Sequence, residues 1–305
     1  MHLVFLLYAL FAGCFTLSKT ALEYSEPFFL IGSRMLLAGV LMIGYEYLFN
    51  RKQILIAKGV LLRLFLLAFF NIYVTNACEF YGLKHLTSFK TCFIYSLSPF
   101  LSALFSYFLL KETLTKKKWL GLTVGFLGFT PILFSETGAG ASSLLSVSWP
   151  EIAVAMAAVC SVYGWILLRQ LVNENQMTPF MANGISMLLG GIFALGHSLA
   201  VETWNPIPVT SFVPFFECAI GVMIISNLLA YNLYGYLLKF YTAPFMSFAG
   251  FTTPIFTAIL GWFFLGEVVT LPYYISGAIV FSGLYIFHQD ELTKGYTVKE
   301  PAINT

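Results

Sequence analysis

The chain has 305 residues, of which 59% are hydrophobic and only 10% are charged, and its mean hydropathy is +0.83. A water-soluble protein of this length needs far more charge to cover its surface, so this composition excludes that class and indicates many membrane-spanning segments. The 16 basic residues nearly balance the 14 acidic residues, which gives no indication of a nucleic-acid partner.

Long apolar runs follow one another along the chain, and a run of about 20 residues is enough to cross the hydrocarbon core. Because lipid offers no hydrogen-bond partner to free backbone groups, each run is expected to be helical. The first run follows His2 and no basic leader, so we interpret it as a membrane helix and not as a secretory signal. The sequence predicts an all-α polytopic membrane protein with ten transmembrane helices in a lipid bilayer. The ten runs cover residues 2–21, 28–49, 60–82, 88–110, 118–134, 151–169, 180–201, 212–238, 244–265 and 272–288.

The basic residues are concentrated on one side of the predicted helices. Twelve of the sixteen fall in loops, helix ends or a tail on the side of the N-terminus. The loops predicted on the other side, 135–150, 201–211 and 266–271, contain none. Basic loops stay in the cytoplasm, so both termini are expected there, in a multi-pass protein of the cell inner membrane.

Two stretches, residues 80–112 and 235–267, repeat one another at an offset of 155 positions, with ten identities and no gap. An odd number of helices in each half makes the second copy inverted relative to the first. The basic stretch KETLTKKK at the end of the first copy becomes GEVVTLP, without a lysine, in the second. Inverted repeats of this kind are typical of secondary transporters, whose solute site lies near the membrane midplane between the halves.

The repeat divides the chain into four parts. Two five-helix repeats are joined by an outer linker rich in Gly and Ser and are followed by a cytoplasmic tail. The predicted boundaries of these parts are 1–134, 135–150, 151–290 and 291–305.

Each copy carries a proline, twelve further residues and then an E-x-x-T motif, at Pro99 with Glu112 and at Pro254 with Glu267. A glycine-rich final helix follows in each half. On these motifs and on the helix count, the chain resembles EamA-type members of the drug/metabolite transporter superfamily over residues 1–290. The resemblance implies a transporter of small organic metabolites, and it fixes neither the solute nor the direction.

Within that family, the chain is also similar to members that exchange S-adenosylmethionine for S-adenosylhomocysteine in intracellular bacteria. The likeness lies in the aromatic-rich halves and in Lys90 on the fourth helix. It implies uptake of S-adenosylmethionine in exchange for S-adenosylhomocysteine. Export of amino acids, aromatic ones included, or of other drugs and metabolites stays open, because the same side chains would serve those solutes.

Charges inside a bilayer are candidates for function, because each costs about 2.5–3.5 kcal/mol on insertion scales. Arg34 lies about two turns into its helix, roughly 10 Å deep, and its repeat counterpart is Ser186. We expect Arg34 to pair with Glu79, either as a structural ion pair or within the solute site. Lys19 and Lys90 lie near helix ends and have two interpretations, since a lysine there can also extend its ammonium group to the interface.

Lys90 is expected to contact the solute, because the second copy has Phe245 in its place and the scaffold therefore does not require a lysine. On that interpretation, Lys90→Ala abolishes transport and leaves the amount of folded protein unchanged.

Neutral polar and aromatic side chains complete the predicted site. Asparagines in lipid need hydrogen-bond partners, and four of them lie on the corresponding third and eighth helices. For a zwitterion with an adenine ring and a sulfonium, a basic residue would meet the carboxylate, Glu79 the ammonium, and aromatic faces the ring and the cation. The predicted solute-binding residues are Lys90, Arg34, Glu79, Asn76, Phe15, Lys19, Tyr163, Trp165, Asn227 and Tyr231.

Catalytic and metal-binding motifs are absent from the sequence. The four histidines and five cysteines are scattered, and no Ser/His/Asp grouping or H-E-x-x-H motif occurs. No cofactor or metal is therefore predicted. A membrane-embedded enzyme or a receptor is the alternative from another class, but the first needs a convergent acid–base set and the second long loops or soluble domains. The oligomeric state is left open.

Overall fold

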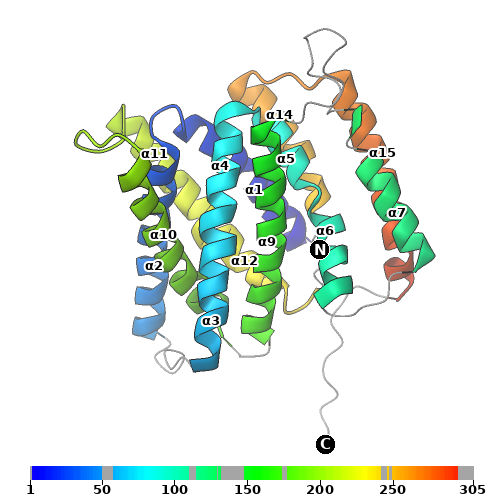
Figure 1. Cartoon of the computed structure of the whole chain (residues 1–305), viewed down its shortest axis with the longest axis horizontal. Helices are drawn as coiled ribbons and strands as arrows, with labels where there is room; N and C mark the ends of the chain where they lie inside the picture. Colours follow the sequence, from blue (N-terminus) through cyan, green and yellow to red (C-terminus); the bar gives the residue numbers. More distant parts are fainter. Residues whose placement is uncertain are drawn as a thin grey trace, which may run out of the picture.

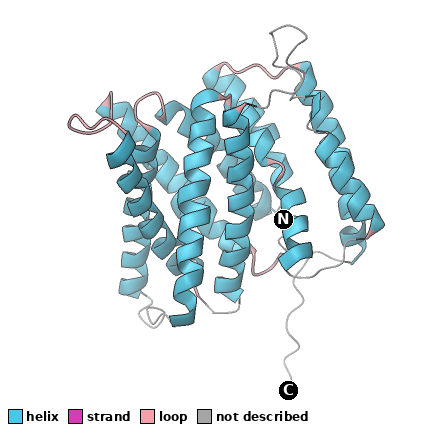
Figure 2. Cartoon of the chain, viewed as in Figure 1, coloured by secondary structure: helices cyan, strands magenta, loops and turns pink. Residues whose placement is uncertain are grey.

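The protein is described by a computed structural model, which covers residues 2–49, 58–109, 115–128, 130–131, 148–173, 177–241, 246 and 249–294. The named elements in these ranges are all helical, and an isolated bridge joins Ser25 and Val209. The helices form one bundle, and the axes of most of them are roughly aligned, with the chain running up one helix and down another (Figures 1 and 2). The all-α part of the predicted fold is confirmed.

Within the described ranges, six helical segments are long and apolar enough to cross a membrane. Four of them are single α-helices: α1 (His2–Ala21), α2 (Pro27–Phe49), α9 (Trp149–Asn173) and α10 (Pro179–Val201). The other two are composite. The first consists of α3 (Lys58–Leu66), η2 (Leu67–Val74) and α4 (Thr75–His85), and the second of α11 (Phe212–Val222), η3 (Met223–Ala230) and α12 (Tyr231–Leu237). All six coincide with predicted runs, with ends that differ by a few residues.

Each composite helix contains a π-helical segment, and the two segments lie at matching places. η2 and η3 each have eight residues, and Met223 follows Leu67 by 156 positions. A π-helical turn bonds each N–H to the carbonyl five residues earlier, so it is wider than an α-helical turn, and such turns are frequent at functional sites. Side chains that follow each π-helical segment therefore lie on a different face of the helix from the one that a regular α-helix of about 3.6 residues per turn predicts.

The predicted run 88–110 is interrupted. α5 (Ser88–Tyr95) ends in a turn at Ser96 and Leu97, and α6 (Ser98–Leu109) follows. The prediction of one continuous helix is wrong here, because the ring of Pro99 clashes with the preceding turn and its nitrogen cannot donate. In the described part of the run 244–265, η4 (Gly250–Thr252) and α14 (Thr253–Leu265) likewise meet just before Pro254.

Two further helices, α7 (Lys116–Leu127) and α15 (Leu271–Lys294), pack against each other at one side of the bundle (Figure 1). Glycines bring their backbones together. A Cβ on Gly121 would lie 2.6 Å from the carbonyl oxygen of Gly283, and one on Gly283 would lie 2.4 Å from the nitrogen of Gly125. Glu112, Phe245, residues 135–147 of the predicted linker and residues 295–305 of the predicted tail lie outside the described part of the chain.

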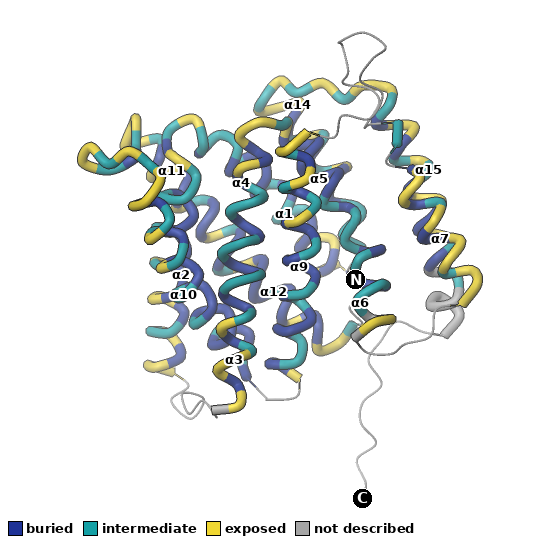
Figure 3. The backbone as a smooth tube through the Cα atoms, in the orientation of Figure 1, coloured by how far each residue is buried: buried dark blue, intermediate teal, exposed yellow. Residues whose placement is uncertain are grey.

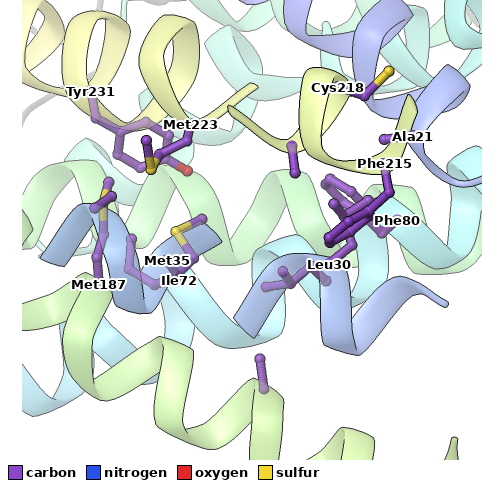
Figure 4. Close-up of a cluster of buried hydrophobic side chains, with 14 of the residues drawn as sticks. Ala21, Leu30, Met35, Ile72, Phe80, Met187, Phe215, Cys218, Met223 and Tyr231 are labelled. Atoms are coloured by element: carbon purple, nitrogen blue, oxygen red, sulfur yellow. The ribbon is translucent and has the colours of Figure 1, made fainter. Parts of the chain in front are cut away.

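The main hydrophobic cluster joins α2, η2, α10 and η3. Met35, Ile72, Met187 and Met223 belong to it, and Tyr231 lies at its edge (Figure 4). Exposed residues, many of them large and apolar, lie on the outward faces of the helices (Figure 3). Such a surface suits lipid, which supports the assignment as a polytopic membrane protein.

Candidate functional site

A cavity of about 140 Å³ lies inside the bundle. Residues of α1, α2, α4, α5, α6, α9, η3, α12, η4 and α14 line it, and none of the lining residues belongs to α7 or α15. Its wall combines a charged group, an aromatic group and several hydroxyls. This combination suits a solute with both ionic and planar parts.

Arg34 is the centre of the charged group. Its side chain is buried, with 4% of the residue exposed. Nη2 donates to Asn76 Oδ1 at 2.6 Å, Nη1 donates to Asn227 Oδ1 at 3.2 Å, and Cζ lies 4.9 Å from the centre of the Phe80 ring. The buried Nε–H has no acceptor among the described residues. The guanidinium is thus held by uncharged groups and keeps donor capacity to spare.

Glu79 lines the same cavity one turn beyond Asn76 on α4. Among the described residues, Glu79 and Arg34 form no ion pair, so the predicted direct pairing is wrong. Arg34 donates instead to the side-chain oxygens of Asn76 and Asn227. Tyr95 on α5 also lines the cavity, and its hydroxyl donates to the carbonyl of Ala157 on α9 at 3.5 Å. The cavity therefore contains a positive and a negative group that do not neutralise each other by contact.

The aromatic group lies on α1, α9 and α12. The rings of Trp165 and Tyr234 stack with centroids 4.1 Å apart, and Tyr231 lies 5.0 Å from Trp165. Phe11 meets Tyr231 and Tyr234 edge to face at 6.3 and 6.4 Å. Tyr8 also lines the cavity, and its hydroxyl donates to the carbonyl of Met246. These faces offer stacking and cation–π surfaces.

Hydroxyls line the wall around the break between α5 and α6. Ser96, Ser98 and Ser102 all border the cavity there, and Ser98 Oγ donates to the carbonyl of Tyr95 at 2.6 Å. Ser161 and Ser226 border it from α9 and η3. The sequence offers one signal for the first three, since Ser-x-Ser-Pro inside an apolar run marks an interrupted helix. Tyr95, the serines, Phe11 and Tyr8 were not among the predicted site residues.

Comparison with known proteins identifies the family. The model of the EamA-like transporter family matches residues 1–134 and 148–288. The chain belongs to the EamA-like transporter family.

This EamA-like transporter has relatives that match it over nearly the whole chain. It is 35% identical over 300 residues to the S-adenosylmethionine/S-adenosylhomocysteine transporter of Chlamydia muridarum (98% of this chain, 94% of the relative). It is 34% identical over 303 residues to the protein of the same name from Chlamydia trachomatis serovar L2 (98% and 91%). It is also 23% identical over 297 residues to the uncharacterized inner membrane transporter YedA of Escherichia coli strain K12 (93% and 91%).

A solved crystal structure shares the fold of this EamA-like transporter, with a TM-score of 0.66 over 93% of both chains and 16% identity. The family and its relatives are transporters, so the chain is a transporter and not an enzyme. With its apolar spans, it is a multi-pass protein of the inner membrane.

The cavity of this EamA-like transporter brings together most of the predicted solute-binding residues. Six of the ten line it: Arg34, Glu79, Asn76, Phe15, Trp165 and Tyr231. Asn227 does not line the cavity, but its side-chain oxygen accepts a hydrogen bond from Arg34 Nη1. At regular α-helical spacing Asn227, Tyr231 and Tyr234 would share one face of the helix. They do not, because Asn227 lies inside the wider turns of η3, whereas both tyrosines lie beyond it.

Lys90 lies outside the cavity, where it pairs with Glu151 at the start of α9. Its Nζ lies 2.9 Å from Glu151 Oε1, and the two side chains are only 2% and 8% exposed. Lys90 on the short α5 thus contacts α9, and this placement gives no support to the expected solute contact, which stays a prediction.

Lys19 and Tyr163 also lie outside the cavity wall. Lys19 Nζ donates to the carbonyls of Leu83 and Leu86 at the end of α4, a position where a cation suits the helix dipole. The ring of Tyr163 lies 5.4 Å from that of Phe70 in η2. Both residues contact other helices in place of the expected solute contact. In the described ranges, no group of three His, Cys, Asp or Glu side chains is placed to hold a metal ion.

Proposed function

We propose that the protein takes up S-adenosylmethionine in exchange for S-adenosylhomocysteine across the inner membrane. The two chlamydial relatives support this solute pair, since they match this chain at 35% and 34% identity over 98% of its length. The observation that carries the proposal is the cavity itself, in which Arg34 and Glu79 face one space without pairing and aromatic rings lie beside them.

The chemistry of the solutes matches these groups. Both carry an amino-acid end, and we assign its carboxylate to Arg34, whose guanidinium can form charge-assisted hydrogen bonds. The ammonium group goes to Glu79. The adenine ring and, in S-adenosylmethionine, the sulfonium lie against Trp165, Tyr231 and Tyr234, where stacking and cation–π attraction act.

We further propose the full topology that the sequence predicts. Ten helices span the membrane as two inverted repeats, 1–134 and 151–290, with an outer linker between them and both termini in the cytoplasm. The matching π-helical segments and the two segments matched by the family model support this division. Transport then proceeds by alternating access, as the two repeats rock about the central cavity.

Proteoliposomes loaded with or without S-adenosylhomocysteine test the solute assignment. We expect uptake of labelled S-adenosylmethionine that depends on the internal S-adenosylhomocysteine. Arg34→Gln should abolish it, whereas Lys84→Gln should not, because Lys84 forms an exposed ion pair with Glu26, away from the cavity. Absence of uptake by the folded protein, with uptake of amino acids in its place, would overturn the proposal in favour of an amino-acid transporter.

A further inference from the structure

The acceptors that hold Arg34 are both neutral amides. Asn76 comes from α4 and Asn227 from η3, and the ring of Phe80 covers a face of the guanidinium. No carboxylate of the described residues pairs with Arg34. A buried guanidinium is usually paired with an acid, because an uncompensated charge is costly away from water. Arg34 is thus fixed in orientation but keeps its net charge available to a ligand.

Asn227 is itself fixed from several sides. It is completely buried, its Nδ2 lies 3.1 Å from Met35 Sδ, and its backbone carbonyl accepts from Asn232 Nδ2 at 3.2 Å. Its Oδ1 faces Arg34. Because it does not line the cavity, it can act on a solute only through Arg34.

The other π-helical segment provides an internal comparison. Asn71 in η2 lies 156 positions before Asn227 and is equally buried, but neither of its side-chain polar atoms has a hydrogen-bond partner in the described part of the chain. The repeat counterpart of Arg34 is Ser186, whose hydroxyl donates to the carbonyls of Ala182 and Asn183 on its own helix. The asparagine therefore occurs in both segments, and only the copy at Asn227 has a guanidinium to hold.

We propose that Asn227 is a positioning residue that makes the transporter select solutes carrying a carboxylate. As a neutral acceptor it aims the Arg34 guanidinium at the cavity without satisfying its charge, so the solute must bring the anion. An aspartate at this position would supply an internal anion that competes with the solute. This inference rests on the proposed function and goes further, since it names the group that sets a specificity.

The test compares exchange of S-adenosylhomocysteine with exchange of its analogue that lacks the carboxyl group, in proteoliposomes of wild type, Asn227→Asp and Asn71→Ala. For wild type we expect the KM for S-adenosylhomocysteine to be much lower than the KM for the analogue without the carboxyl group. Asn227→Asp should raise that KM by about tenfold or more and leave the KM of the analogue nearly unchanged. Asn71→Ala should keep the wild-type discrimination. Asn76→Asp places the same charge beside Nη2 of Arg34 and should also raise the KM for S-adenosylhomocysteine. This second variant keeps the test valid if Asn227→Asp fails to fold.

A purely structural role for Asn227 predicts a different result. Folded protein and maximal rate would then fall together for both solutes, and the discrimination between them would stay at the wild-type value. That outcome overturns the inference. If wild type exchanges neither adenosyl compound, the proposed function fails separately. The same variants are then compared on an amino acid and its decarboxylated amine. If Asn227→Asp leaves the ratio of the two KM values at its wild-type value, the inference is again overturned.

Discussion

Glu79 is the acidic residue among the described residues that line the cavity, and Tyr95 lines the same cavity. A carboxylate there binds an ammonium group by a charge-assisted hydrogen bond, which contributes about 1.5–3 kcal/mol. We therefore expect Glu79→Gln to raise the KM for S-adenosylmethionine by about tenfold or more, with a smaller effect on an analogue without the amino group. Initial uptake rates measured against concentration give both values.

Glu26→Gln is the matched control for this prediction, because Glu26 pairs with Lys84 on the surface, where ion pairs contribute little. Equal KM values for wild type and Glu79→Gln, at equal amounts of folded protein, would remove Glu79 from the ammonium site.

The residues that sequence alone could identify are those whose presence in lipid is costly. Arg34, Glu79 and Asn76 stand out on that ground, and all three line the cavity. Lys90 stands out equally, but depth along a helix does not reveal which neighbour the side chain faces. Tyr95 and the serines escape prediction because neutral hydroxyls are common in membrane helices and carry no comparable cost.

At the scale of elements, carboxylates from the second half of the chain hold the start of α5. Glu267 accepts from the nitrogen and the hydroxyl of Ser88, both at 2.7 Å, and from the nitrogen of Phe89 at 3.2 Å. Glu151 pairs with Lys90, two residues after Ser88. Anionic groups suit a helix N-terminus, since they satisfy its free N–H groups and its dipole.

Removing one member of the buried Lys90–Glu151 pair leaves the other charge uncompensated. We expect Lys90→Met alone to destabilise the protein by about 3–5 kcal/mol. The double variant Lys90→Met/Glu151→Gln should recover most of the loss, because the glutamine still accepts from Ser148, which donates to Glu151 from its nitrogen and its hydroxyl. Thermal unfolding in detergent, followed by size-exclusion chromatography, measures the stability of the single and the double variant.

Transport by the double variant then decides the role of Lys90. Retained uptake is expected, because Lys90 does not line the cavity. A double variant that folds like wild type and transports nothing would return Lys90 to the solute site.

Helix winding is the element-scale property that spacing rules could not predict. The runs containing η2 and η3 are apolar along most of their length, and no particular residue types distinguish a π-helical turn from an α-helical one. The break between α5 and α6, by contrast, follows from Pro99 and was predictable in principle. Regular α-helical spacing would put Asn227 on the same face as Tyr231, and the structure separates them.

At the scale of the whole molecule, six spans follow from hydropathy alone, whereas none of the four other predicted runs meets the same length and hydropathy criteria for a span within the described ranges. The offset of 155 positions between the repeated stretches lies close to the 156 that separates the π-helical segments. The internal repeat was therefore visible in the sequence. The packing of α7 against α15 through glycines was not, because the sequence alone does not show which helices are neighbours.

The proposed orientation predicts the location of the C-terminus. Alkaline phosphatase, which becomes active only outside the cytoplasm, should be inactive when fused after Lys294 and active when fused after Asn205, in the loop between α10 and α11. A fluorescent protein fused after Lys294 serves as the complementary reporter and should fluoresce. Phosphatase activity at the C-terminal fusion would contradict the proposed orientation.

Arg34, Glu79 and Trp165 reach the cavity from three separate helices, α2, α4 and α9. With the carboxylate, the ammonium group and the remainder of the solute each assigned to one of them, the carbon between those groups has three fixed attachment points. Three such points distinguish a tetrahedral carbon from its mirror image, because the opposite hand reaches only two of them at once. Selection of one enantiomer would then arise from the spacing of three helices and from no single side chain.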